Sequence, residues 1–156
     1  MWCELKRVIK PRGAVVLFAA QPFTSALVMS NAGWFRYSLV WHKTMATNFM
    51  SVRLQPAKKH EDICVFYRQQ PTYNPQMQAG KPYTDNRNRA DKKIGVHDTE
   101  TSQRRPIQNT GLRYPETVLH FSNGNSETVH PTQKPVELLR YLVRTYTNPG
   151  ETVLDF

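Results

Sequence analysis

His130-Pro-Thr-Gln-Lys-Pro135 stands one helix away from Thr152-Val-Leu-Asp-Phe156, and this pairing is the clearest pattern in the sequence. The prolines stiffen the entry to a helix over 136–146, and Asn148-Pro-Gly150 ends it. The buried face of this helix is expected to carry four apolar residues, Val136, Leu139, Leu142 and Val143. Residues 151–156 then begin an apolar strand that reaches an acid. In α/β folds, such an acid at the carboxyl edge of the sheet holds a cofactor's ribose or amino group.

The preceding chain also reads as alternating helices and strands. Residues 1–13 resemble the end of a helix that runs into the turn Pro11-Arg12-Gly13. Residues 14–18 are all apolar and predict a strand buried on both faces, of the kind found in parallel sheets. A helix is predicted over 22–32, and further strands are predicted over 35–42 and 61–68. The sequence therefore predicts an α/β fold.

Two segments are polar and basic. Residues 43–60 contain Lys43, Arg53, Lys58, Lys59 and His60 without an acid, which indicates a basic loop. Residues 69–125 lose apolar periodicity, apart from a short predicted strand at 117–121. Insertions of this length inside a domain are usually functional or disordered.

Composition limits the function. The 156 residues suit one domain, and a formal charge of +9 indicates a polyanionic partner, most simply nucleic acid. No apolar run is long enough for a membrane span, and the N-terminus does not read as a signal peptide. Cys3 and Cys64 lie far apart, so we expect reduced thiols in a cytoplasmic protein and no metal site.

The two motifs, in this order and spacing, resemble the β-class of S-adenosylmethionine-dependent DNA amino-methyltransferases of phages and restriction–modification systems. Residues 5–18, 40–43 and 59–66 are similar to further segments of that family. The resemblance implies part of a Rossmann-like class I methyltransferase fold over 1–156, with a mixed, mostly parallel sheet. The basic insertion 69–125 would be its target-recognition-like part.

The resemblance also implies site residues. The motifs place a cofactor pocket for S-adenosylmethionine at His130, Thr132, Lys134, Asp155 and Phe156. Val40-Trp-His-Lys43 looks like the segment beside the target base, so Trp41 and Lys43 would wall the pocket of an extruded adenine; alternatively they are a core Trp and a solvated Lys. Six basic residues would contact double-stranded DNA; alternatively they belong to solvated basic segments. They are Lys58, Lys59, Arg87, Arg89, Arg104 and Arg105.

The sequence also departs from the family. Its catalytic tetrapeptide, (Asp/Asn/Ser)-Pro-Pro-(Tyr/Trp/Phe), needs a Pro-Pro pair that these residues lack, and the glycine loop expected after Phe156 is absent. We therefore assign no catalytic residue. The expected function is adenine-N6 DNA methylation, with this chain inactive alone. The alternatives are a catalytically dead DNA-binding remnant and one half of a split methyltransferase. In addition to DNA, the expected partner is a second copy of this chain or a complementing chain. Cytosine-N4 stays open as the target.

Overall fold

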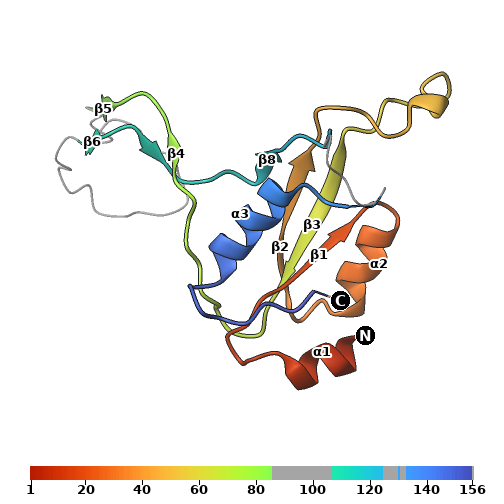
Figure 1. The fold of residues 1–156 in the computed structure, drawn as a ribbon, viewed down its shortest axis with the longest axis horizontal. Helices are drawn as coiled ribbons and strands as arrows, with labels where there is room; N and C mark the ends of the chain where they lie inside the picture. Colours follow the sequence, from red (N-terminus) through yellow and green to blue (C-terminus); the bar gives the residue numbers. More distant parts are fainter. Residues whose placement is uncertain (86–106, 125–129, 131–132, 156) are drawn as a thin grey trace, which may run out of the picture. The chain divides into compact units, whose positions relative to one another are not determined.

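The computed structural model describes residues 1–85, 107–124, 130 and 133–155. Contacts divide the chain into two units, one of residues 1–76 with 116–156 and the other of residues 77–115. The first unit holds the large sheet and the α-helices of the described residues (Figure 1).

The first unit is built on a four-stranded sheet in the order β1-β3-β2-β8. Its strands are β1 (Val15–Ala19), β2 (Phe35–His42), β3 (His60–Phe66) and β8 (Val118–His120). β3 lies between β1 and β2 and pairs antiparallel with both, whereas β2 and β8 are parallel. The strands expected over 14–18, 35–42, 61–68 and 117–121 are therefore present.

The mixed α/β class is confirmed, but the parallel share of the sheet is smaller than expected. The strand over 14–18 was expected to be of the kind found in parallel sheets, whereas β1 pairs antiparallel with β3. The apolar run reflects layers of side chains packed on both faces of β1, and that burial does not depend on the direction of the neighbouring strand.

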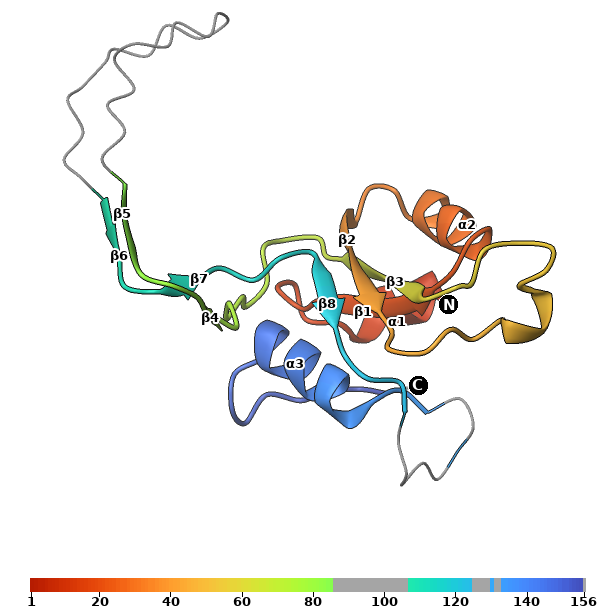
Figure 2. The same ribbon diagram turned by 90° about the horizontal axis from the view of Figure 1, so that it is seen from above.

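Helices cover both faces of this sheet (Figure 2). α1 (Trp2–Val8) and α2 (Phe23–Ser30) lie on one face, and α3 (Val136–Tyr146) lies on the other. β3 divides its side chains between the two layers, since Ile63 and Val65 pack toward α3 while Cys64 and Phe66 pack toward α1 and α2. All four side chains are fully buried, which makes β3 the centre of the core.

The predicted helix 136–146 is confirmed, but its buried face is rotated from the expected one. Leu138, Leu142, Thr145 and Tyr146 are buried, at the i, i+4, i+7 and i+8 positions of one stripe. Of the expected face, Leu142 is buried, and the other residues are partly exposed: Val136, Leu139 and Val143. Thr145 can be buried on this stripe because its hydroxyl donates a hydrogen bond to the Tyr141 carbonyl, at 2.7 Å.

Residues 151–155 do not form the expected strand, and Phe156 lies outside the described residues. Val153 and Leu154 are 54% and 63% exposed. An apolar sequence becomes a strand only where a neighbouring backbone accepts and donates hydrogen bonds, and within the described chain no strand pairs with this segment.

The described part of the second unit contains two short antiparallel pairings. β4 (Gln78–Ala79) pairs with β7 (Leu112–Arg113), and β5 (Tyr83–Asp85) pairs with β6 (Ile107–Asn109). Gly111 links β6 to β7 with φ +98°, and a Cβ there would meet the Gly80 carbonyl oxygen at 2.6 Å. Only glycine fits this turn. No helix in the described part of the chain is long and apolar enough to cross a membrane.

Candidate functional site at the carboxyl edge of the sheet

Three charged residues from distant parts of the sequence meet at one edge of the large sheet. Lys43 directly follows β2, Glu61 is the second residue of β3, and Lys134 comes shortly before α3. β1 and β2 both end at this edge, and in open α/β sheets ligands bind outside the carboxyl ends of strands.

Glu61 binds both lysines. The Lys43 ammonium donates to Glu61 Oε1 at 2.5 Å, and the Lys134 ammonium donates to Oε2 at 2.6 Å. The exposed fractions of the Lys43, Glu61 and Lys134 side chains are 5%, 18% and 30%. Lys43 is therefore a buried ion, whereas Lys134 retains contact with solvent.

Aromatic rings surround the two ammonium groups. Lys134 Nζ lies 5.0 Å from the centre of the Phe18 ring and 5.6 Å from that of Trp41. Lys43 Nζ lies 4.9 Å from the Trp41 ring. The Trp41 indole N–H donates to the Phe121 carbonyl at 2.9 Å, which fixes the ring. These ring faces attract the cations and replace part of the water that burial removes.

Glu61 is ionised at neutral pH. Burial alone raises the pKa of this carboxyl, but hydrogen bonds from Lys134 and Lys43 outweigh that effect and hold the pKa below its usual value. The cluster thus has one negative and two positive charges.

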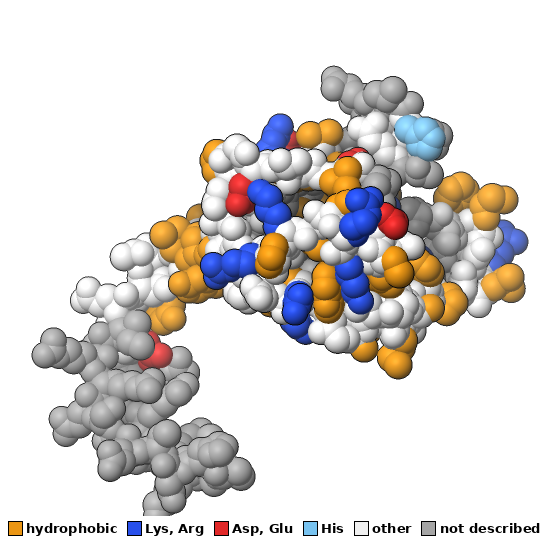
Figure 3. All heavy atoms as spheres, turned by 90° about the horizontal axis from the view of Figure 1, so that it is seen from below, with side chains coloured by type: hydrophobic (Ala, Val, Ile, Leu, Met, Phe, Trp, Pro, Cys, Tyr) orange, Lys and Arg blue, Asp and Glu red, His pale blue; other side chains and the backbone are white. Residues whose placement is uncertain are grey.

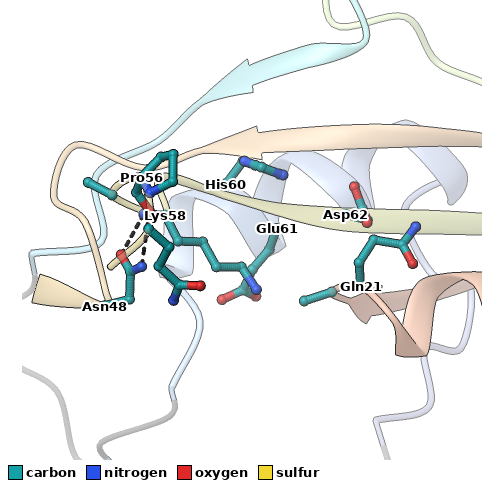
Figure 4. A pocket seen from close by; sticks show the side chains of 10 residues that line it. Gln21, Asn48, Pro56, Lys58, His60, Glu61 and Asp62 are labelled. Atoms are coloured by element: carbon teal, nitrogen blue, oxygen red, sulfur yellow. Dashed lines mark hydrogen bonds between the residues drawn. The ribbon is translucent and has the colours of Figure 1, made fainter. Parts of the chain in front are cut away.

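Beside this cluster lies a pocket of about 310 Å³, at the lower end of the range of small-molecule sites. The loop between β2 and β3 lines one side with Asn48, Pro56 and Lys58, and Gln21 and Asp62 stand on the other (Figure 4). Glu61 lies between them (Figure 4).

Asp62 faces the opposite side of β3 from Glu61. Its carboxylate accepts a hydrogen bond from the Thr24 hydroxyl of α2 at 2.6 Å. Alternation along the strand thus directs one carboxylate toward α3 and the next toward α2. Within the described residues, no group of three or more His, Cys, Asp or Glu is arranged to hold a metal ion.

The structure brings together three of the residues that the sequence singled out: Trp41, Lys43 and Lys134. Trp41 and Lys43 are only 3% and 4% exposed, so they lie behind the surface of the site. Lys43 is buried and not solvated, and the Glu61 carboxylate compensates its charge.

The structure describes four of the other predicted site residues. His130 and Asp155 are exposed, Lys58 lines the pocket and Lys59 is exposed next to it. The rest lie outside the described residues: Arg87, Arg89, Arg104, Arg105, Thr132 and Phe156.

Glu61 and Asp62 were missed by the sequence reasoning. Their signal was available, since two consecutive acids open a strand whose next four residues are fully buried and almost entirely apolar. Acids at the start of a buried strand are costly unless they are paired or bind something.

Comparisons with known proteins identify the family of the chain. Residues 1–156 match the N6/N4 methyltransferase family model, described as DNA methylase. The type II methyltransferase M.XycI of Xanthomonas campestris pv. cyanopsidis is 26% identical over 135 residues, which make up 86% of this chain and 37% of that protein. A crystal structure of the M1.HpyAVI–SAM complex has the same fold, with a TM-score of 0.53 and 18% identity over 93% of this chain and 57% of that one.

Because the family match covers the whole sequence, the chain belongs to the N6/N4 DNA methylase family. The expected family is thereby confirmed. The chain spans little more than a third of the M.XycI sequence and 57% of the M1.HpyAVI chain.

Proposed function

We propose that this chain forms part of the catalytic domain of an S-adenosylmethionine-dependent enzyme that methylates the exocyclic N6 of adenine in DNA. The observation that carries the proposal is the position of Lys134. This lysine belongs to the most specific motif in the sequence, and Glu61 holds it at the carboxyl edge of the sheet beside a pocket. The match of the whole chain to the DNA methylases supports the same function.

The described residues fit the cofactor chemically. S-adenosylmethionine carries a carboxylate, an ammonium and ribose hydroxyls. An ammonium group has three N–H donors, and Glu61 takes one from Lys134, whose side chain is 30% exposed. A further donor is therefore available for the cofactor's carboxylate. Carboxylates at the pocket, Glu61 and Asp62, suit hydroxyl or ammonium donors.

When bound, the cofactor supplies an electrophilic methyl group to the amine of the target base. Within this chain we assign Lys134 to cofactor binding, together with His130, Thr132, Asp155 and Phe156 of the same motifs. Glu61 is a positioning residue, because it orients Lys134 through Oε2 and neutralises Lys43 through Oε1. Trp41 and Lys43 support the wall of the target-base pocket from behind, since both are buried.

The DNA would lie along the basic segments of the chain. Lys58 and Lys59 flank the pocket and would contact phosphates, which position a duplex without reading its sequence. We assign the same role or a base-reading role to Arg87, Arg89, Arg104 and Arg105 in the insertion 69–125.

A cofactor-binding experiment tests the assignment of Lys134. Equilibrium dialysis with labelled S-adenosylmethionine should detect binding to the chain, and Lys134→Gln should weaken it at least tenfold. Lys10→Gln is the matched control, because Lys10 is exposed away from this edge of the sheet. Equal binding by the Lys134 and Lys10 variants would contradict the assignment.

A transfer experiment tests activity and the target base. The chain is incubated with duplex DNA and methyl-labelled S-adenosylmethionine, and the nucleosides are then separated. We expect no transfer by this chain alone, because its sequence contains no Pro-Pro pair for the family's catalytic tetrapeptide. Adding a second chain that carries the tetrapeptide should yield N6-methyladenine if the enzyme is split. Retained DNA binding without transfer under either condition would favour a DNA-binding remnant, and N4-methylcytosine would overturn the adenine assignment.

A further inference from the structure

The loop between β2 and β3 displays apolar side chains to solvent. Four residues near its 3₁₀ turn η1 (Phe49–Ser51) form what we call the apolar tip: Phe49, Met50, Val52 and Leu54. Met50 and Leu54 are 87% and 92% exposed, and Phe49 is 72% exposed. Clustered apolar side chains that remain in water mark an interaction surface more often than isolated ones do.

A frame of hydrogen bonds holds the tip in a defined shape. The Asn48 side chain donates to the Pro56 carbonyl at 3.1 Å and accepts from the Lys58 backbone N–H at 2.5 Å, which closes the loop at its base. Inside it, the Leu54 N–H donates to the Ser51 carbonyl at 2.9 Å. The apolar side chains are therefore presented by a folded turn.

The charges around the tip indicate the chemistry of its partner. Residues 43–60 contain four lysines or arginines and no acid, and Arg53 lies within the tip itself. Figure 3 shows apolar and basic side chains next to one another on the face of the first unit that is seen from below. A duplex matches this combination, because its phosphates are anionic and its stacked bases are apolar.

The position of the loop connects the tip to the proposed reaction. Asn48, Pro56 and Lys58 line the pocket beside Glu61, so the base of the loop is a wall of the site and the tip extends beyond it. An enzyme that modifies an amine inside a duplex must first take the base out of the stack, which leaves a gap. Apolar side chains such as Phe, Leu and Met can be inserted between base steps.

We propose that the apolar tip is a wedge that enters the duplex next to the extruded base and occupies the space that it leaves. This inference rests on the proposed function, since it requires duplex DNA as the partner. Phe49, Met50 and Leu54 supply the wedge, and Arg53 binds the adjacent phosphate.

Matched methionine variants test the wedge. Met50→Ser and Met29→Ser make the same change at similarly exposed positions, 87% and 75%, in the tip and on α2. Binding to a fluorescein-labelled duplex is measured by anisotropy at several salt concentrations. Met50→Ser should weaken binding about tenfold without changing the salt dependence, because the lost contact is apolar. Met29→Ser should bind like the wild type. Arg53→Gln should instead lower the slope of log K against log salt by about 1.

A tryptophan reporter separates insertion from contact at the surface. In Met50→Trp the added indole should lose fluorescence and become shielded from iodide when DNA is bound, after subtraction of the wild-type signal. Met29→Trp should remain accessible to iodide.

The possible failures are distinguishable. If the wild type does not bind duplex DNA, the proposed function fails and the wedge with it. If the wild type binds and Met50→Ser and Met29→Ser bind equally well, the wedge alone is overturned. If Met50→Ser turns a dimer into a monomer in sedimentation while DNA affinity is unchanged, the tip is an interface between copies of this chain, which also overturns the wedge.

Discussion

Replacing Glu61 by glutamine should destabilise the fold more than removing either lysine that it binds. Glutamine keeps the size of the side chain but removes its charge. The Lys43 side chain, which is 5% exposed, then loses the carboxylate that compensates its charge in the core. Removing one partner of a buried pair costs roughly 3–5 kcal/mol, and because the Glu61 side chain is 18% exposed we expect about 3 kcal/mol.

The two lysine substitutions should cost less. Lys43→Met removes the buried charge itself, while Glu61 keeps Lys134 as a partner, so we expect a loss of about 1 kcal/mol. Lys134→Gln leaves the Lys43–Glu61 pair intact and removes a partly solvated partner, which should also cost about 1 kcal/mol.

The double variant Glu61→Gln/Lys43→Met is the decisive measurement. It has no unpaired charge in the core, so it should be about 2 kcal/mol more stable than Glu61→Gln alone. Urea unfolding followed by circular dichroism gives the unfolding free energies of the wild type, Glu61→Gln, Lys43→Met and the double variant. If the losses of unfolding free energy in Glu61→Gln and Lys43→Met simply add, the double variant is the least stable of the series. Lys43 without its carboxylate would then not be the cause of the loss in Glu61→Gln.

Three further predictions concern the pH dependence and the core. The pKa of Glu61 is lower in the folded chain than its usual 4.5, so its contribution to stability is complete above pH 4.5 and is lost as the pH falls through the folded pKa. The difference in unfolding free energy between wild type and Glu61→Gln should therefore shrink in acid. A difference that grows would contradict this sign. Tyr37→Phe should cost about 1 kcal/mol in urea unfolding, because the buried Tyr146 hydroxyl loses its partner at 2.8 Å. Leu138→Ala should cost about 3 kcal/mol because this side chain is fully buried, and its neighbour control Leu139→Ala, at 38% exposure, should cost well under half as much; equal losses would show that the buried face of α3 is assigned wrongly.

The elements of the first unit were largely predictable from local pattern. Residues 136–146 were predicted as a helix and form α3 with the same bounds. The apolar run of β1 and the strands 35–42 and 61–68 also show in the sequence, because burial selects apolar residues wherever the strand is placed. Pairing direction was not predictable in this way, since it depends on which strands become neighbours. Residues 151–155 show the converse, because their strand-like pattern has no paired backbone in the described structure.

The candidate site was predictable only in part, for a related reason. The motif around Lys134 indicated a functional lysine, and the segment ending at Lys43 indicated another. What joins them is Glu61, which is 18 residues from Lys43 and 73 from Lys134 in the sequence. A carboxylate's role is decided by such distant partners, so neither spacing nor composition could assign it. The role of Trp41 could not be assigned from the sequence either, because it depends on the burial of this side chain under other elements.

The alternation along β3 also constrains how this sequence can change over time. Glu61 and Asp62 are adjacent, yet one binds lysines near α3 and the other a threonine of α2. An insertion or deletion of one residue between Asp62 and Phe66 would put the two ends of the strand out of phase, so that either the acids would face each other's partners or the apolar side chains beyond the change would swap layers. Substitutions in β3 can be compensated one at a time, whereas a change in its length cannot. Among relatives of this chain, the spacing from the paired acids to the end of the strand should therefore vary less than the identity of the residues within it.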